Sequence, residues 1–81
     1  MTEEEKRELS EEIVNQRFRK RINQAEMAKE LNISVPTYRT LEKDPGKLDI
    51  DQIMTISKKL EWNLTKFFLD NVLQSAIKNE G

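Results

Sequence analysis

The chain contains neither cysteine nor histidine among its 81 residues. Disulfide bonds are therefore excluded, and the composition argues against a zinc site and against catalysis by a thiol or an imidazole. Glycine and proline are scarce as well, with two residues of each. Because Glu, Lys, Leu and Ile are abundant, this scarcity predicts an all-α domain.

Long apolar runs are also absent from the sequence. No stretch approaches the roughly 20 apolar residues of a membrane-spanning helix, and the acidic start TEEEKREL has neither the basic nor the apolar region of a signal peptide. We therefore expect a cytoplasmic protein that does not enter a membrane. A length of 81 residues suits a single domain, 1–81, with one hydrophobic core.

Patterns of catalytic residues are missing too. Asp49 with Asp51, and Glu11 with Glu12, are carboxylate pairs, but such pairs are usually helix caps or surface residues. There is no glycine-rich phosphate loop, and the serines have no histidine to activate them. We expect no enzymatic activity, no cofactor and no metal.

The charges are unevenly distributed although the net charge is only −1. Residues 1–16 carry a local net charge of −4, residues 17–47 carry +4 and residues 48–81 carry −1. A positive segment is typical of a surface that binds phosphates, but a solvated helix surface of mixed charge would have the same composition. The positive residues of the middle segment are Arg17, Arg19, Lys20, Arg21, Lys29, Arg39, Lys43 and Lys47.

Apolar spacing and capping residues predict five helices. The first follows a capping box of Thr2 and Glu5 and reaches about residue 21, the second covers about 24–31, and the third covers 35 to about 43. Asp49 caps the fourth, and Asn63 caps a fifth that continues toward residue 78. The residues expected in the core are Leu9, Ile13, Phe18, Ile22, Met27, Ala28, Leu31, Tyr38, Leu41, Ile53, Ile56, Ser57, Leu60, Trp62, Leu64, Phe67 and Phe68.

Residues 24–42, QAEMAKELNISVPTYRTLE, are the most informative part of the chain. Ala28 is small enough for two helices to cross closely, and Asn32 tolerates the left-handed conformation of a tight turn. Ile33 plugs this turn, and Ser34 is a good N-cap for the next helix. The pattern predicts a helix-turn-helix, in which the second of the two helices enters the DNA major groove.

Over about residues 13–68 the chain resembles the lambda-repressor-like family (Cro/CI-type, XRE-like) of phage and bacterial regulators. The resemblance rests on Gln24-x-x-x-Ala28, on Ser34, on Leu41-Glu42 and on the late element Leu60-Glu61-Trp62-Asn63-Leu64. Two departures concern glycines. Asn32 replaces the usual turn glycine, and Asp44-Pro45-Gly46 replaces the glycine after the third helix, which affects the phosphate contacts expected of that loop.

The resemblance implies a compact five-helix fold that binds double-stranded DNA through residues 35–43. Val35 and Pro36 would contact thymine methyl groups, and Gln24 would hold a phosphate with its amide. Arg39 is the one side chain on the exposed face able to make a bidentate guanine contact, although a phosphate contact or a solvated charge remains open. The predicted DNA-binding residues are Asn23, Gln24, Val35, Pro36, Thr37, Arg39, Thr40, Lys43 and Lys47.

The same resemblance pairs Arg17 with Glu42 as a structural anchor for the third helix. The function expected is a transcriptional regulator, most simply a repressor that controls its own promoter. The alternatives are the antitoxin of a toxin–antitoxin pair, with a toxin or an antirepressor as protein partner, and a protein-interaction domain that no longer binds DNA.

We also expect a homodimer on a palindromic operator, because a single helix-turn-helix offers few base contacts. Residues 69–81 extend the predicted fifth helix beyond the resemblance. Five apolar residues of this segment share one helix face, and they would either form the dimer contact or fold back on the first helix. They are Leu69, Val72, Leu73, Ala76 and Ile77.

Overall fold

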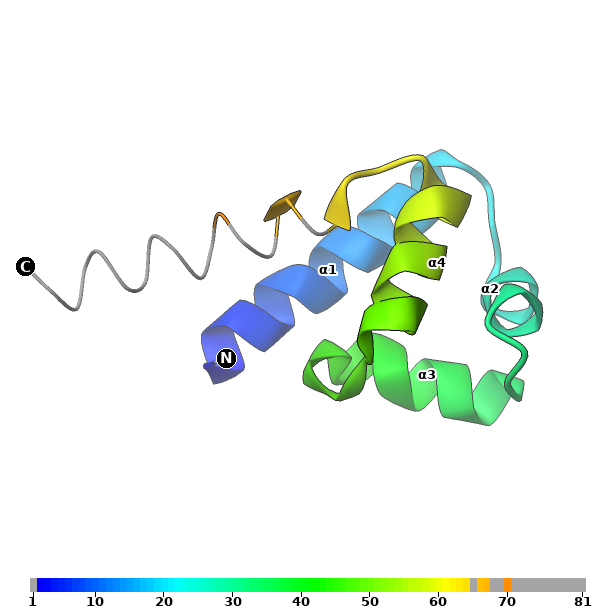
Figure 1. Cartoon of the computed structure of the whole chain (residues 1–81), viewed down its shortest axis with the longest axis horizontal. Coiled ribbons are helices and arrows are strands. Elements are labelled where there is room, and N and C mark those ends of the chain that lie inside the picture. The colour runs from blue at the N-terminus through cyan, green and yellow to red at the C-terminus, as the bar shows by residue number, and fades with distance from the viewer. Residues whose placement is uncertain (1, 65, 68–69, 71–81) are drawn as a thin grey trace, which may run out of the picture.

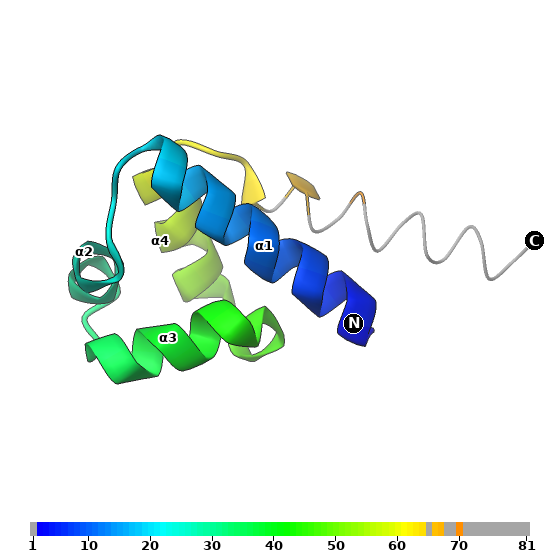
Figure 2. The ribbon, with the colours of Figure 1, turned by 180° about the vertical axis from the view of Figure 1, so that it is seen from behind.

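A computed structural model describes residues 2–64, 66, 67 and 70 of the chain. In these residues all regular structure is helical, which confirms the predicted all-α class. The elements are α1 (Glu3–Arg19), α2 (Gln24–Glu30), α3 (Val35–Lys43), the short 3-10 helix η1 (Pro45–Lys47) and α4 (Ile50–Leu60). In Figures 1 and 2, α3 runs along one edge of the domain, α2 closes one end, and α4 rises from α3 toward the C-terminal end of α1.

Each of the four α-helices begins at a side-chain cap. Thr2 with Glu5, and Asp49 with Gln52, form capping boxes that satisfy backbone N–H groups in both directions. The Asn23 side chain accepts a hydrogen bond from the Glu26 N–H at 2.8 Å, and that of Ser34 accepts one from the Thr37 N–H at 3.3 Å. The capping roles predicted for Thr2, Ser34 and Asp49 are therefore confirmed.

A further helical turn begins after α4. Leu64, Lys66 and Phe67 are helical, and the Asn63 side chain accepts a hydrogen bond from the Lys66 N–H at 2.8 Å. The predicted cap at Asn63 is thus confirmed. The rest of the predicted fifth helix lies outside the described residues, and so do Phe68 and the predicted dimer residues Leu69, Val72, Leu73, Ala76 and Ile77.

Three helix ends close with a non-glycine residue in the left-handed region. These residues are Arg21 (φ 57°), Asn32 (φ 58°) and Glu61 (φ 50°). After α2, the Asn32 N–H donates to the Lys29 carbonyl at 3.1 Å and the Ile33 N–H donates to the Ala28 carbonyl at 2.9 Å, which is the Schellman arrangement. The reversal predicted at Asn32 is therefore confirmed, and α1 ends at Arg19 rather than near residue 21 because Arg21 leaves the helical conformation.

The core lies where α1, α2, α3 and α4 meet. Leu9, Ile13, Met27, Ala28, Tyr38, Ile56, Leu60 and Leu64 are buried in one cluster, and Ile22, Leu31, Ile33, Val35, Leu48, Ile53, Trp62 and Phe67 pack against it. Trp62 lies beside Phe67, with ring centroids 5.5 Å apart, so its predicted place in the core is confirmed. Burial of these side chains is the main source of the fold's stability.

Phe18 corrects one prediction, because its side chain is 67% exposed rather than buried in the core. Leu9 and Ile13 lie four residues apart on α1, and continuing that spacing places Arg17, not Phe18, on the buried face. Phe18 instead lies against the Arg17 guanidinium, whose Cζ is 5.0 Å from the ring centroid. It covers a buried cation from the solvent side, in a cation–π contact.

We predict that Arg21→Gly raises the free energy of unfolding by about 1 kcal/mol, because glycine adopts positive φ without the steric cost that a Cβ imposes. Arg19→Gly is the matched control. It should lower the free energy by roughly 0.5–1 kcal/mol, since Arg19 has ordinary helical geometry. Urea unfolding followed by circular dichroism measures both. A loss of stability in Arg21→Gly would show that the left-handed residue carries no strain.

Candidate functional site

The surface formed by α2 and α3 holds most of the residues that the sequence singled out. The two helices are joined by residues 31–34, and Ala28, which is buried, lies where they pack. Pro36 occupies the first turn of α3, where a missing N–H costs nothing. Tyr38 and Leu41 face the core, so the opposite side of α3 is turned outward.

The outward side of α3 is narrower than the sequence predicted. Val35 is only partly exposed and packs against the core, because it lies three residues before the buried Tyr38 on the same side of the helix. The Thr40 hydroxyl donates to the Pro36 carbonyl at 3.2 Å, within α3 itself. The predicted contact residues that are exposed on α3 are Pro36, Thr37, Arg39, Thr40 and Lys43.

A buried ion pair joins α1 to the last turn of α3. The Arg17 Nε donates to Glu42 Oε2 at 3.0 Å and an Arg17 Nη donates to Glu42 Oε1 at 3.1 Å, with the two side chains only 9% and 6% exposed. A second Arg17 Nη donates to the Ile22 carbonyl at 3.1 Å, which ties the guanidinium to the chain after α1. Such a bidentate pair fixes orientation as well as distance. The Ser10 hydroxyl adds a link from α1 by donating to the backbone carbonyl of Glu42.

Two further side chains extend this pair to the surface. The Gln24 Nε2 donates to Glu42 Oε1 at 3.2 Å, and Arg39 Nε donates to Gln24 Oε1 at 3.1 Å. The Gln24 amide, expected to hold a phosphate, is thus engaged at both ends within the protein. Sequence reasoning did not find the contact between Gln24 and Arg39, which are separated by 15 positions.

The Tyr38 hydroxyl is buried beside this network and has no hydrogen-bond partner. Burial raises the pKa of Tyr38 far above its ordinary value; the neighbouring Glu42 carboxylate raises that pKa further, whereas Arg17 acts in the opposite direction. Tyr38 therefore keeps its proton well above the pH at which an exposed tyrosine ionises. An unpaired buried hydroxyl costs stability relative to an apolar group of the same shape.

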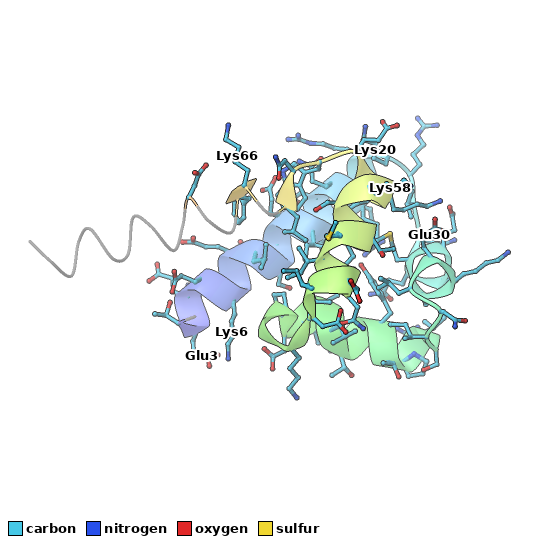
Figure 3. The ribbon with its side chains drawn as sticks, in the orientation of Figure 1. Glu3, Lys6, Lys20, Glu30, Lys58 and Lys66 are labelled. Atoms are coloured by element: carbon cyan, nitrogen blue, oxygen red, sulfur yellow. The ribbon has the colours of Figure 1, made fainter. Side chains whose placement is uncertain are left out.

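The remaining predicted residues lie at the two ends of the α2–α3 surface. Asn23 is exposed at the start of α2, where its side chain serves as the cap. Lys47 is exposed in η1, and its Nζ lies 3.9 Å from Asp44 Oδ2. Asp44 also pairs with Lys6 of α1, whose Nζ lies 3.8 Å from Asp44 Oδ1. Figure 3 shows Glu3 and Lys6 on the end of α1 beside this turn. No ion pair is found for Lys43 in the described part of the chain.

Positive charge is not confined to the α2–α3 surface. Figure 3 shows Lys20, Lys58 and Lys66 at the side of the molecule opposite to α3. Lys20 pairs there with Glu61, at 3.3 Å. The described residues contain no group of three acidic, cysteine or histidine side chains arranged as metal ligands. They also contain no helix with the length and apolar character needed to cross a bilayer.

Comparison with known proteins does not place the chain in a family, because it matches no protein-family model, no curated protein and no solved structure.

We predict that breaking the Arg17–Glu42 pair from either side destabilises the fold by roughly 3–5 kcal/mol, because the remaining charge stays buried without a partner. Arg17→Met and Glu42→Leu remove one partner each. The free energy of unfolding of the double variant should fall by less than the sum of the two single losses, and by less than about 3 kcal/mol. Urea unfolding of all three variants measures this. Strictly additive losses would show that the pair makes no coupled contribution.

We predict a loss of stability above about pH 10 that depends on Tyr38. The unfolded chain releases the tyrosine proton near pH 10 while the folded chain retains it, so the free energy of unfolding falls with rising pH by up to about 1.4 kcal/mol per pH unit. Tyr38→Phe removes this component and should be at least as stable as wild type at neutral pH. The measurement is urea unfolding between about pH 8 and pH 11.5, a range that brackets the tyrosine pKa of the unfolded chain. Identical pH curves would contradict the prediction.

Proposed function

We propose that this protein is a sequence-specific double-stranded DNA-binding transcriptional regulator that acts in the cytoplasm. In this proposal α2 and α3 form a helix-turn-helix of the lambda-repressor-like type, and α3 enters the major groove. The mode of action is that of a repressor controlling its own promoter. The observation that carries the proposal is the arrangement of α3, which exposes Pro36, Thr37, Arg39, Thr40 and Lys43 while the Arg17–Glu42 pair holds its last turn.

This arrangement suits base readout because a recognition helix must be exposed and rigid at once. Phosphate contacts from flexible lysines give affinity without sequence preference, whereas base contacts need side chains on a fixed helix. Arg39 offers the bidentate donor that guanine prefers, and Pro36 and the Thr40 methyl offer apolar contacts to thymine. Lys43 and Lys47 would contribute phosphate contacts at the C-terminal end of α3, and Asn23 at the start of α2.

The proposed regulator is a homodimer that binds a palindromic operator. One copy of α3 offers few base-directed groups, particularly because Val35 turns partly toward the core. A two-fold dimer would read two half-sites about one helical turn of DNA apart. The residues proposed for the dimer contact, Leu69, Val72, Leu73, Ala76 and Ile77, lie outside the described residues.

A second candidate function is an antitoxin that binds a protein partner, and the exposed apolar side chains favour it. Phe18, Ile50 and Met54 are large apolar side chains that are 67%, 73% and 62% exposed. Ile50 and Met54 lie four residues apart on α4 and therefore share one face of that helix. Basic residues also occur opposite α3, as Lys20, Lys58 and Lys66 do (Figure 3), and such scattered charge favours instead a protein-interaction domain that does not bind DNA. An open reading frame for a toxin beside this gene would favour the antitoxin.

We expect the purified protein to select a palindromic sequence from a random duplex pool. Its affinity for that sequence should fall steeply with salt concentration, because phosphate contacts release counterions. Arg39→Ala should reduce discrimination at one base-pair position of each half-site by about 1–3 kcal/mol. Lys47→Ala, the matched control, should weaken binding to all sequences about equally.

Selection of no sequence, or an affinity that is insensitive to salt, would contradict the DNA-binding proposal. Selection of a single site without two-fold symmetry would contradict the homodimer alone. An equal loss for every sequence in Arg39→Ala would assign Arg39 to a phosphate.

A further inference from the structure

A continuous chain of hydrogen bonds runs from the interior of the protein to the exposed face of α3. It begins at the buried Arg17–Glu42 pair, passes to Gln24 through the contact between Nε2 and Glu42 Oε1 at 3.2 Å, and ends at Arg39 Nε, 3.1 Å from Gln24 Oε1. Glu42 and Arg39 lie on α3, three residues apart, and Gln24 is the first residue of α2. This series of hydrogen bonds therefore connects α2 and α3, the two helices of the candidate interface.

The neighbours of Gln24 determine how its amide is oriented. The Glu42 carboxylate can only accept hydrogen bonds, so the NH₂ group of Gln24 must face Glu42. The guanidinium of Arg39 can only donate, so it requires the Gln24 oxygen. A single amide orientation satisfies both partners, and the side chain of Gln24 is half-buried between them.

We propose that Gln24 is a positioning residue that determines the sequence specificity of Arg39, and that it does not serve as a phosphate ligand. This inference rests on the proposed function. Gln24 occupies the Nε of Arg39, so only the two terminal nitrogens remain to contact DNA. Those two nitrogens form a fork that can bind O6 and N7 of guanine or, end-on, two oxygens of a phosphate.

Two physical consequences favour guanine over phosphate as the target of Arg39. A side-on contact, in which Nε and one terminal nitrogen bind two oxygens of a phosphate, would require the bond to Gln24 to break. An arginine that is already held also loses less conformational freedom when it binds, which favours a contact that demands one geometry. The Gln24 oxygen is held by Arg39 and one amide N–H by Glu42, so only the second amide N–H is left to contact a phosphate.

Gln24→Met tests the proposal, because methionine keeps the length of the side chain and removes both hydrogen bonds. With the selected operator and its single base-pair variants, Gln24→Met should reduce discrimination at the position read by Arg39 by roughly 3- to 10-fold. Arg39→Ala should reduce discrimination at that same position by roughly 10- to 100-fold. The double variant should match Arg39→Ala, because the two residues act as one unit. Gln16 lies on α1 and donates a hydrogen bond to Glu12. Gln16→Met is therefore the matched control and should leave the discrimination between sequences unchanged.

A second measurement uses the protein without DNA. The Arg39 Nε–H, observed by nuclear magnetic resonance, should exchange with water more slowly in wild type than in Gln24→Met. Equal exchange rates would overturn the proposal, since the contact would then be absent in solution.

The outcomes separate this inference from the function on which it rests. If wild type selects a sequence but Gln24→Met weakens every sequence equally, then Gln24 is a phosphate ligand and the inference is overturned. If wild type selects no sequence, the proposed function fails and the guanine role of Arg39 fails with it. A loss of discrimination confined to the Arg39 position supports both.

Discussion

The position of α3 against α1 is set by the buried ion pair of Arg17 and Glu42. Removing two charges from water costs several kcal/mol per ion, and only close, well-oriented hydrogen bonds offset that cost. Here the offset comes from the bidentate contact, from the Ile22 carbonyl and from Gln24, with Phe18 covering the guanidinium. The pair is therefore better understood as fixing one geometry than as a large net source of stability.

Much of the fold could be predicted from short-range signals. Thr2, Ser34 and Asp49 mark helix starts because their side chains satisfy N–H groups a few residues away, which is a local effect. Asn32 marks a reversal because asparagine tolerates the left-handed conformation, which is also a local effect. Arg21 and Glu61 adopt the same left-handed conformation without any such signal, because tertiary packing of the neighbouring helices outweighs their local preference.

The candidate site was harder to predict because it depends on long side chains. The exposed face of α3 follows from helical spacing, but the partners of Gln24 and Arg39 depend on which rotamers meet across two helices. Phe18 shows a different difficulty. The spacing of apolar residues alone leads from Ile13 to Phe18, whereas the buried position on α1 belongs to Arg17, whose charge is compensated by a residue 25 positions later.

The attachments between α1 and the end of α3 have a consequence for how this chain can change. Lys6 contacts Asp44, Ser10 contacts the Glu42 backbone and Arg17 contacts the Glu42 side chain. Three residues along α1 are thus attached to the C-terminal end of α3. A substitution at an exposed position between these residues leaves their alignment intact. An inserted or deleted residue turns one part of the helix by about 100° relative to the other and separates the attachments. The exposed positions between Lys6 and Arg17 are thus open to change in residue type, whereas the segment as a whole is closed to change in length.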